Sequence, residues 1–174
     1  MPHSFHLKRF SKMKQIPNDL FFAWVESEIE QGRSVQIRLK GVSMYPLLRE
    51  GKDEVVLSAC PVKDLLAMDL VLFKYQSTHI LHRVISRDGD MLVLRGDGSF
   101  RVTESCSVHD VIGRVEAVVR PSGKAISVKS WKWRLPSFLW CKMGIFRRPV
   151  LRMLFFLKKH YICRTGSDNR MCFN

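Results

Sequence analysis

From residue 34 to residue 128, short runs rich in Val, Ile and Leu alternate with turn-forming residues. The runs cover residues 35–40, 54–58, 70–75, 79–86, 91–95, 111–120 and 124–128. Asp, Gly, Pro and Ser in residues 87–90 and 121–123 are typical of tight hairpin turns. Regular short strands joined by tight turns predict a mostly β fold, either an antiparallel sheet or a partly closed β-barrel.

A helix is predicted immediately before the β region. Apolar residues recur at helical spacing from Leu20 to Ile29. Asn18 can cap the first turn, Asp19 is favourable within it, and Gly32 is a fitting C-terminal stop. We therefore expect one amphipathic N-terminal helix over residues 18–32, packed on the β domain beside Ser43.

The chain after residue 129 has a different character. Aromatic and basic residues alternate from Trp131 to Arg134. Residues 150–157 are apolar apart from Arg152 and are followed by Lys158 and Lys159, which predicts a short helix in a basic C-terminal tail. We divide the chain into a basic lead (residues 1–17), a helix and β domain (residues 18–129) and a basic aromatic tail (residues 130–174).

The charge balance indicates an anionic partner. Lys and Arg total 29 against 16 Asp and Glu, giving a formal net charge of +13, and residues 117–167 contain no carboxylate side chain. The segment from Trp131 to Lys159 suits the interface of an anionic membrane. The alternative is that this segment packs against the β domain or a partner protein. Single-stranded nucleic acid is a third partner, which the absence of any other nucleic-acid module disfavours.

Cysteine usage and the lengths of the apolar stretches bear on cofactors and location. The five cysteines are scattered and no two have C-x-x-C spacing, which indicates reduced thiols and no zinc site. The first residues lack the apolar run of a signal peptide, and no uncharged apolar stretch reaches about 18 residues. We expect a cytoplasmic or peripheral membrane protein that uses no metal or organic cofactor.

A candidate nucleophile lies at a corner that follows the first predicted strand. Gly41 permits a sharp turn, and Pro46 fixes its own backbone and holds Tyr45 extended. Ser43 should therefore occupy a rigid corner, where a catalytic hydroxyl can be held in attack geometry. Taken alone, a serine in this context is more often the cap of a turn.

A serine hydroxyl needs a base, and the base needs an orienting partner. His82 lies in an apolar strand, and Asp97 follows Gly96 at the end of a later strand. Taken singly, His82 is more often a buried core histidine and Asp97 a turn residue. Together with Ser43 they form a candidate Ser-His-Asp site. His79 and His82 point to opposite faces of one strand, so we do not expect them to share a metal.

Five segments resemble, in order, the motifs of the signal peptidase I superfamily, which also contains the LexA-type self-cleaving repressors. The segments are residues 41–48, 68–73, 81–84, 95–97 and 112–115, and the resemblance spans residues 35–119. His82 stands where many members have Lys, which is similar to the archaeal and endoplasmic-reticulum branch. A LexA-like processing protease is a second variant, but no helix-turn-helix precedes Ser43 and His82 disfavours it.

The resemblance implies catalytic roles for three residues. Ser43 would be the nucleophile, His82 the general base and Asp97 the acid that orients the imidazole. A histidine suits the role of base because its ordinary pKa already lies near neutrality.

The resemblance also implies supporting roles around these three residues. Met44 and Pro46 would shape the site, and backbone N–H groups at the serine corner would help form an oxyanion hole. Gly98 stands where this branch usually has Asn, and Glu104 is a candidate for the further acid that usually follows.

The function implied is that of a serine endopeptidase that cleaves leader or signal-like peptides of pre-proteins through an acyl-enzyme. The substrate would lie extended along the sheet edge, with small residues before the cut. The alternative is a catalytically silent β-barrel binding module that uses its basic tail on membrane or nucleic acid.

Overall fold

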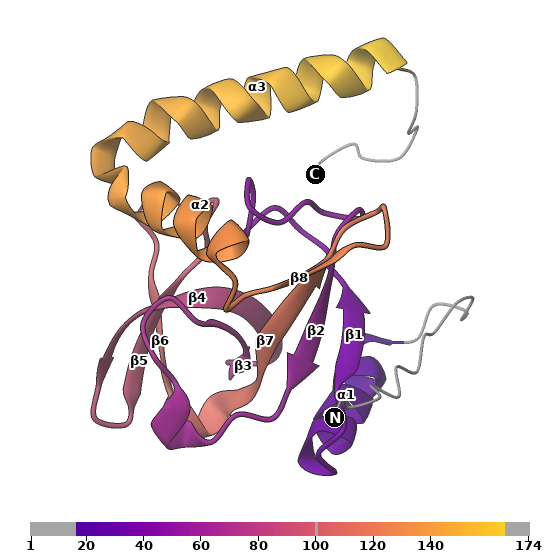
Figure 1. The fold of residues 1–174 in the computed structure, drawn as a ribbon, viewed down its shortest axis with the longest axis vertical. Helices are drawn as coiled ribbons and strands as arrows, with labels where there is room; N and C mark the ends of the chain where they lie inside the picture. Colours follow the sequence, from indigo (N-terminus) through magenta and orange to yellow (C-terminus); the bar gives the residue numbers. More distant parts are fainter. Residues whose placement is uncertain (1–16, 100, 166–174) are drawn as a thin grey trace.

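The computed structural model describes residues 17–99 and 101–165, and within them an antiparallel β-sheet forms the centre of the molecule (Figure 1). The strands are β1 (Val35–Arg38), β2 (Glu54–Ser58), β3 (Leu70–Tyr75), β4 (Thr78–Asp88), β5 (Met91–Arg95), β6 (Glu104–Ser107), β7 (Val111–Val119) and β8 (Ala125–Ser127). The helices are α1 (Asn18–Glu30), α2 (Trp131–Lys142) and α3 (Arg147–Thr165), with 3-10 turns η1 (Val62–Asp64), η2 (Val108–Asp110) and η3 (Gly144–Phe146).

The strands form an 8-stranded sheet in the order β1-β2-β7-β3-β4-β5-β6, with β8 paired to β7. All seven pairings are antiparallel, which confirms the predicted antiparallel sheet. Register shifts interrupt the β2–β7, β3–β7 and β4–β5 ladders, and such bulges bend a sheet. In the described ladder the end strands β1 and β6 do not pair with each other, so the sheet is not closed into a barrel.

The strand predictions agree closely with the structure where β-branched and aliphatic residues dominate. The runs at residues 54–58, 70–75 and 91–95 coincide with β2, β3 and β5. The predicted strand at 35–40 ends at Arg38, and the one at 79–86 extends to Thr78 and Asp88. Sequence analysis missed β6, because Cys106 is its only apolar residue and pairing with β5 provides its strand geometry.

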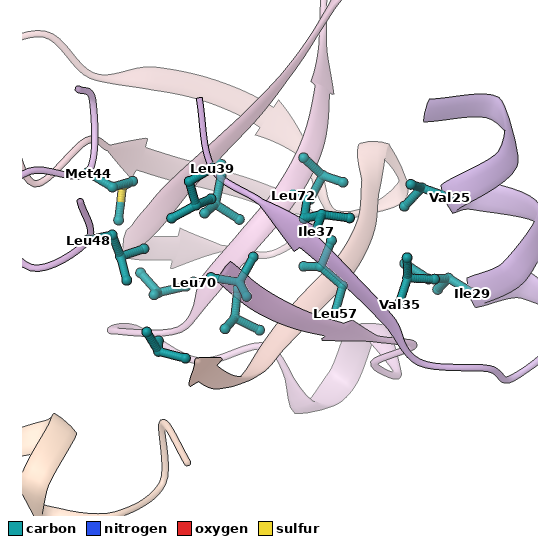
Figure 2. Close-up of a cluster of buried hydrophobic side chains, with 14 of the residues drawn as sticks. Val25, Ile29, Val35, Ile37, Leu39, Met44, Leu48, Leu57, Leu70 and Leu72 are labelled. Carbon is teal, nitrogen blue, oxygen red and sulfur yellow. The ribbon is translucent and has the colours of Figure 1, made fainter. Parts of the chain in front are cut away.

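Helix α1 packs its apolar face on the sheet. Val25 and Ile29 are buried, and they point toward the strands in Figure 2. The helix ends at Glu30, and Gly32 follows with φ of 75°, as expected for a glycine stop. The prediction that Asn18 caps the helix was wrong, because Pro17 occupies the cap position without a side-chain hydrogen bond.

The principal core lies between α1, the sheet and the loop that follows β1. Met44 and Leu48, both buried, extend from this loop into the cluster that contains Leu39 and Leu70 (Figure 2). Burying two such side chains contributes about 1.5–3 kcal/mol each. The core therefore anchors the loop that carries Ser43, which we call the Ser43 loop (residues 39–53).

The C-terminal segment is more helical than its sequence pattern predicted. The predicted helix at residues 150–157 lies inside the longer α3, and the aromatic-basic stretch before it forms α2. Trp133, Trp140 and Leu151 are buried, so both helices pack on the β domain. Helix α1 lies at the opposite end of the sheet from α3 and the Ser43 loop in Figure 1, so the prediction that α1 packs beside Ser43 was wrong. None of the helices in the described residues is long and apolar enough to cross a membrane.

Candidate active site

Ser43 lies at an exposed corner of the Ser43 loop. Gly41 has φ of 85°, a conformation that favours glycine, and its N–H donates to Glu50 Oε1 at 2.8 Å. The Tyr45 N–H donates to the Val42 carbonyl at 3.0 Å, which closes a turn around Ser43. The corner predicted from Gly41 and Pro46 is therefore present, and Ser43 is exposed on it.

His82 lies on β4, beneath this corner. Its side chain is buried, with 6% of the residue exposed, and Nδ1 lies 2.9 Å from Glu104 Oε2. Because a carboxylate only accepts hydrogen bonds, this contact assigns the proton to Nδ1 and leaves the lone pair on Nε2. An imidazole in this tautomer can act as a base at Nε2.

The free nitrogen of His82 faces the same space as the Ser43 backbone. A Cβ built on Gly96 would lie 3.0 Å from His82 Nε2 and 2.5 Å from the Ser43 carbonyl oxygen. The Ser43 carbonyl oxygen and His82 Nε2 therefore both lie beside the Cα of Gly96. The Ser43 hydroxyl makes no hydrogen bond to any residue that the structure describes, so the serine–histidine bond itself is not formed.

The surroundings of His82 favour its neutral form. Burial is the largest influence and lowers the pKa of His82 below its ordinary value of 6.5, while the Glu104 carboxylate and, more weakly, Asp97 oppose that shift. The pKa of His82 therefore lies below neutrality. A neutral imidazole at neutral pH is the protonation state that a general base requires.

Asp97 does not contact His82, contrary to the geometry expected from the sequence. Its carboxylate accepts two hydrogen bonds from Arg83, at 2.9 Å from Nε and 2.7 Å from Nη2. Both residues are almost fully buried, at 2% and 0% exposed. The carboxylate of Glu104, predicted only as a supporting acid, occupies the position beside His82 instead.

The turn at residues 96–98 packs directly against the backbone of the Ser43 loop. The Gly98 N–H donates to the Ser43 carbonyl at 2.7 Å. A Cβ on Gly98 would lie only 2.5 Å from the Val42 carbonyl oxygen, a distance that real Cβ atoms essentially never show. Glycine therefore stands after Asp97 because the contact between the two loops leaves no room for a side chain.

The Ser43 corner also presents backbone donors. The N–H groups of Ser43 and Met44 donate to no residue in the described part of the chain. Met44 is buried, which fixes the backbone at this point, and Pro46 follows a cis peptide bond with Tyr45. Two adjacent N–H groups beside a nucleophile can stabilise a developing oxyanion.

Two C-terminal residues reach the same turn, and sequence reasoning did not identify them. The Trp140 indole N–H and the Arg147 guanidinium both donate to the Asp97 carbonyl, at 3.0 and 2.5 Å. No sequence signal links residues that lie 43 and 50 positions from their partner. Arg83 was detectable, because an arginine inside an apolar strand needs a buried partner.

A cavity among the described residues lies away from Ser43. It measures about 780 Å³ and lies between α2 and the start of β3, where Met68, Arg83 and Phe138 are among its lining residues. Ser43, His82 and Glu104 do not line it. This cavity therefore does not belong to the candidate site.

Within the described residues, no group of three His, Cys, Asp or Glu side chains is arranged to hold a metal ion. Comparison of the sequence with known protein families finds no match. A search of curated proteins finds no match either.

Proposed function

We propose that the protein is a serine endopeptidase with Ser43 as nucleophile and His82 as general base. The observation that carries this proposal is the His82 imidazole, which has Nδ1 bound to Glu104 and Nε2 directed at the Ser43 corner. A buried histidine held in this tautomer is the arrangement that activation of a serine requires. Glu104 takes the orienting role, and a catalytic role for Asp97 stays a prediction.

The reaction proceeds through an acyl-enzyme. Ser43 Oγ attacks the scissile carbonyl while His82 Nε2 accepts its proton, and the N–H groups of Ser43 and Met44 bind the oxyanion. The imidazolium, stabilised by Glu104, then protonates the leaving amine. Water hydrolyses the ester by the same steps in reverse order, with His82 again as base.

The proposed substrate is an extended leader or signal-like peptide of a pre-protein with small residues before the cut. Strand β1 pairs with β2 along one side, and its other edge carries no strand in the described ladder. A peptide can add to such an edge by main-chain hydrogen bonds. Because the Ser43 loop follows β1 directly, a peptide bound there would continue past the serine. A partly closed barrel of the signal peptidase and LexA type belongs to this proposal.

The test uses a panel of peptides with Ala-x-Ala before the cut and scrambled controls. The wild-type chain should cleave the panel selectively, and Ser43→Ala and His82→Ala should each lower kcat at least about 10²-fold. Ser122→Ala, at an exposed hairpin, is the matched control and should cleave normally. A serine-reactive phosphonate should add covalently to the wild type and not to Ser43→Ala, as read by mass spectrometry.

A catalytically silent binding module is the second candidate. The observation that favours it is the absence of a Ser43–His82 hydrogen bond, together with the cationic C-terminal helices. Folded wild-type protein that neither cleaves any peptide nor takes up the phosphonate would reject the peptidase and support the binding module.

A further inference from the structure

Helix α3 has an inner face that holds it on the β domain. Phe155 lies against Tyr45, with ring centroids 5.4 Å apart, and Lys158 lies 3.6 Å from Glu50. Arg147 and the buried Leu151 belong to the same face, since residues 147, 151, 155 and 158 follow helical spacing. These contacts fix which side of α3 points away from the protein.

The outer face of α3 consists of two parallel rows of exposed residues. Residues 148, 152 and 156 form one row and residues 149, 153 and 157 form the other. The rows are Arg148, Arg152 and Phe156, and Pro149, Met153 and Leu157. Met153, Phe156 and Leu157 are 56%, 61% and 54% exposed, which is unusual for large apolar side chains on a helix that already has a packed face.

Helix α2 and turn η3 precede α3 in the chain, and α2 lies beside the start of α3 in Figure 1. Their large apolar side chains are also exposed, and Ile145 is the most exposed of all those in the described residues, at 74%. The side chains concerned are Trp131, Leu135, Phe138, Leu139, Ile145 and Phe146. We call these side chains and the outer face of α3 together the α2–α3 surface; Trp131, Leu135 and Phe138 also line the cavity beside Met68.

The charge of the α2–α3 surface has one sign. Residues 117–167 contain no carboxylate, so no acidic side chain of these helices neutralises Lys132, Arg134, Lys142, Arg148 or Arg152. Among the described residues of α2, η3 and α3, an ion pair forms between Lys158 and Glu50, on the inner face of α3. The outward cations therefore keep their attraction for an anionic partner.

We propose that the α2–α3 surface docks on an anionic lipid bilayer. Aliphatic and aromatic side chains that alternate with Lys and Arg match the two layers of such a membrane, acyl chains below and charged headgroups above. No helix in the described residues is long and apolar enough to span the membrane, so in this proposal α2 and α3 lie in its plane. A protein partner would need acidic side chains placed opposite each of these cations. An anionic bilayer presents negatively charged headgroups over its whole surface and needs no such match.

Docking would also bring the candidate active site to the membrane. The inner face of α3 contacts Tyr45, two residues from Ser43, so a helix held in the interface keeps the Ser43 loop beside it. This consequence rests on the proposed function, whereas the docking itself does not. Lipid binding is therefore measured on Ser43→Ala as well as on the wild type, and both should bind alike.

The experiment is co-sedimentation of the full chain with vesicles. Binding to phosphatidylcholine vesicles that contain phosphatidylglycerol should exceed binding to pure phosphatidylcholine, and it should weaken as salt rises. Arg148→Glu with Arg152→Glu should lower the anionic-vesicle affinity about tenfold or more. Phe156→Ala should lower it several-fold, because a buried aromatic ring is lost from the interface.

Matched controls separate this surface from the general positive charge of the chain. Lys63→Glu reverses an exposed cation in η1, and Met91→Ala removes an apolar side chain that is 49% exposed on β5. Neither should change vesicle binding by more than about twofold. Circular dichroism of each variant establishes that it is folded.

Three outcomes would overturn the proposal. Equal binding to neutral and anionic vesicles would remove the role of the cations. Unchanged affinity in the Arg148 and Arg152 double variant would show that other basic segments of the chain bind the vesicles. Tighter binding to a single-stranded oligonucleotide than to vesicles, lost in Phe156→Ala, would assign the surface to nucleic acid.

Discussion

At the residue scale, the two carboxylates beside the site have different partners. Glu104 faces the His82 imidazole, while Asp97 forms a bidentate pair with Arg83. A guanidinium offers a fork of donors that matches a carboxylate, so the Arg83 pair satisfies both Asp97 oxygens. Glu104 is consequently the carboxylate through which the protonation of His82 is controlled.

Glu104→Gln should lower kcat and shift its pH dependence. The wild-type rate should rise with pH through the His82 pKa, which burial places below 6.5, because only neutral imidazole accepts a proton. Glu104 raises that pKa, so its neutralisation should move the acid limb to lower pH while lowering kcat about 10²-fold or more. The pH profiles of kcat for both chains provide the measurement.

Asp97→Asn is the informative comparison. Breaking a buried pair leaves Arg83 without its counter-charge, which should lower the free energy of unfolding by about 3 kcal/mol or more. Urea denaturation measures this loss of stability. Glu104→Gln should lower the free energy of unfolding by less than Asp97→Asn does. An acid limb that stays in place in Glu104→Gln, and moves instead in Asp97→Asn, would return the orienting role to Asp97.

At the element scale, the site depends on contact between two loops. The turn at residues 96–98 holds the Ser43 loop by a hydrogen bond from Gly98 and by close packing against Val42. The core holds the same loop from below through Met44 and Leu48. The position of Ser43 relative to β4 therefore depends on both contacts, the one with the 96–98 turn and the one with the core.

Gly98→Ala should disturb the site more than the fold. Its Cβ would meet the Val42 carbonyl at 2.5 Å, so the Ser43 loop must shift and kcat should fall about 10²-fold. Overpacking of this kind costs about 1–3 kcal/mol of stability. Gly113→Ala is the matched control, because its Cβ meets Ile29 at 2.8 Å beneath α1, away from Ser43. Equal loss of kcat in both variants would count against the loop contact.

The sequence predicts individual elements better than it predicts their contacts. Glycine and proline indicate the Ser43 corner, and β-branched runs identify β2, β3 and β5, because these signals are local. Strand β6 has only Cys106 to mark it, and it is β6 that brings Glu104 to His82. The orienting acid could not be assigned from sequence because its position depends on the β5–β6 pairing.

At the scale of the whole molecule, the C-terminal helices are part of the folded domain. The sequence-based division at residue 129 separates Trp133, Trp140 and Leu151 from the β domain, yet all three are buried against it. The guanidinium of Arg120 also lies over the Trp133 ring, with Arg120 Cζ 5.8 Å from the ring centroid. The composition of residues 130–174 indicated a separate segment, but it did not reveal that Trp133 and Trp140 are buried.

A chain that ends at Lys129 should therefore be less stable than the full chain. The loss of three buried apolar side chains should lower the free energy of unfolding on the order of 5 kcal/mol. Thermal denaturation followed by circular dichroism measures the change in Tm. The full-length Arg148→Glu and Arg152→Glu variant is the control, because it changes only exposed positions and should keep its Tm. An unchanged Tm in the shortened chain would make the helices dispensable for the fold.

The bond between Trp140 and the Asp97 carbonyl has a spectroscopic consequence. The indole N–H is buried, so its proton should exchange slowly with deuterium and give a resonance separate from that of the exposed Trp131. The chemical shift of that resonance would report on the conformation of the 96–98 turn in solution. Addition of peptide, phosphonate or lipid could then be read as a change at one proton beside the serine corner.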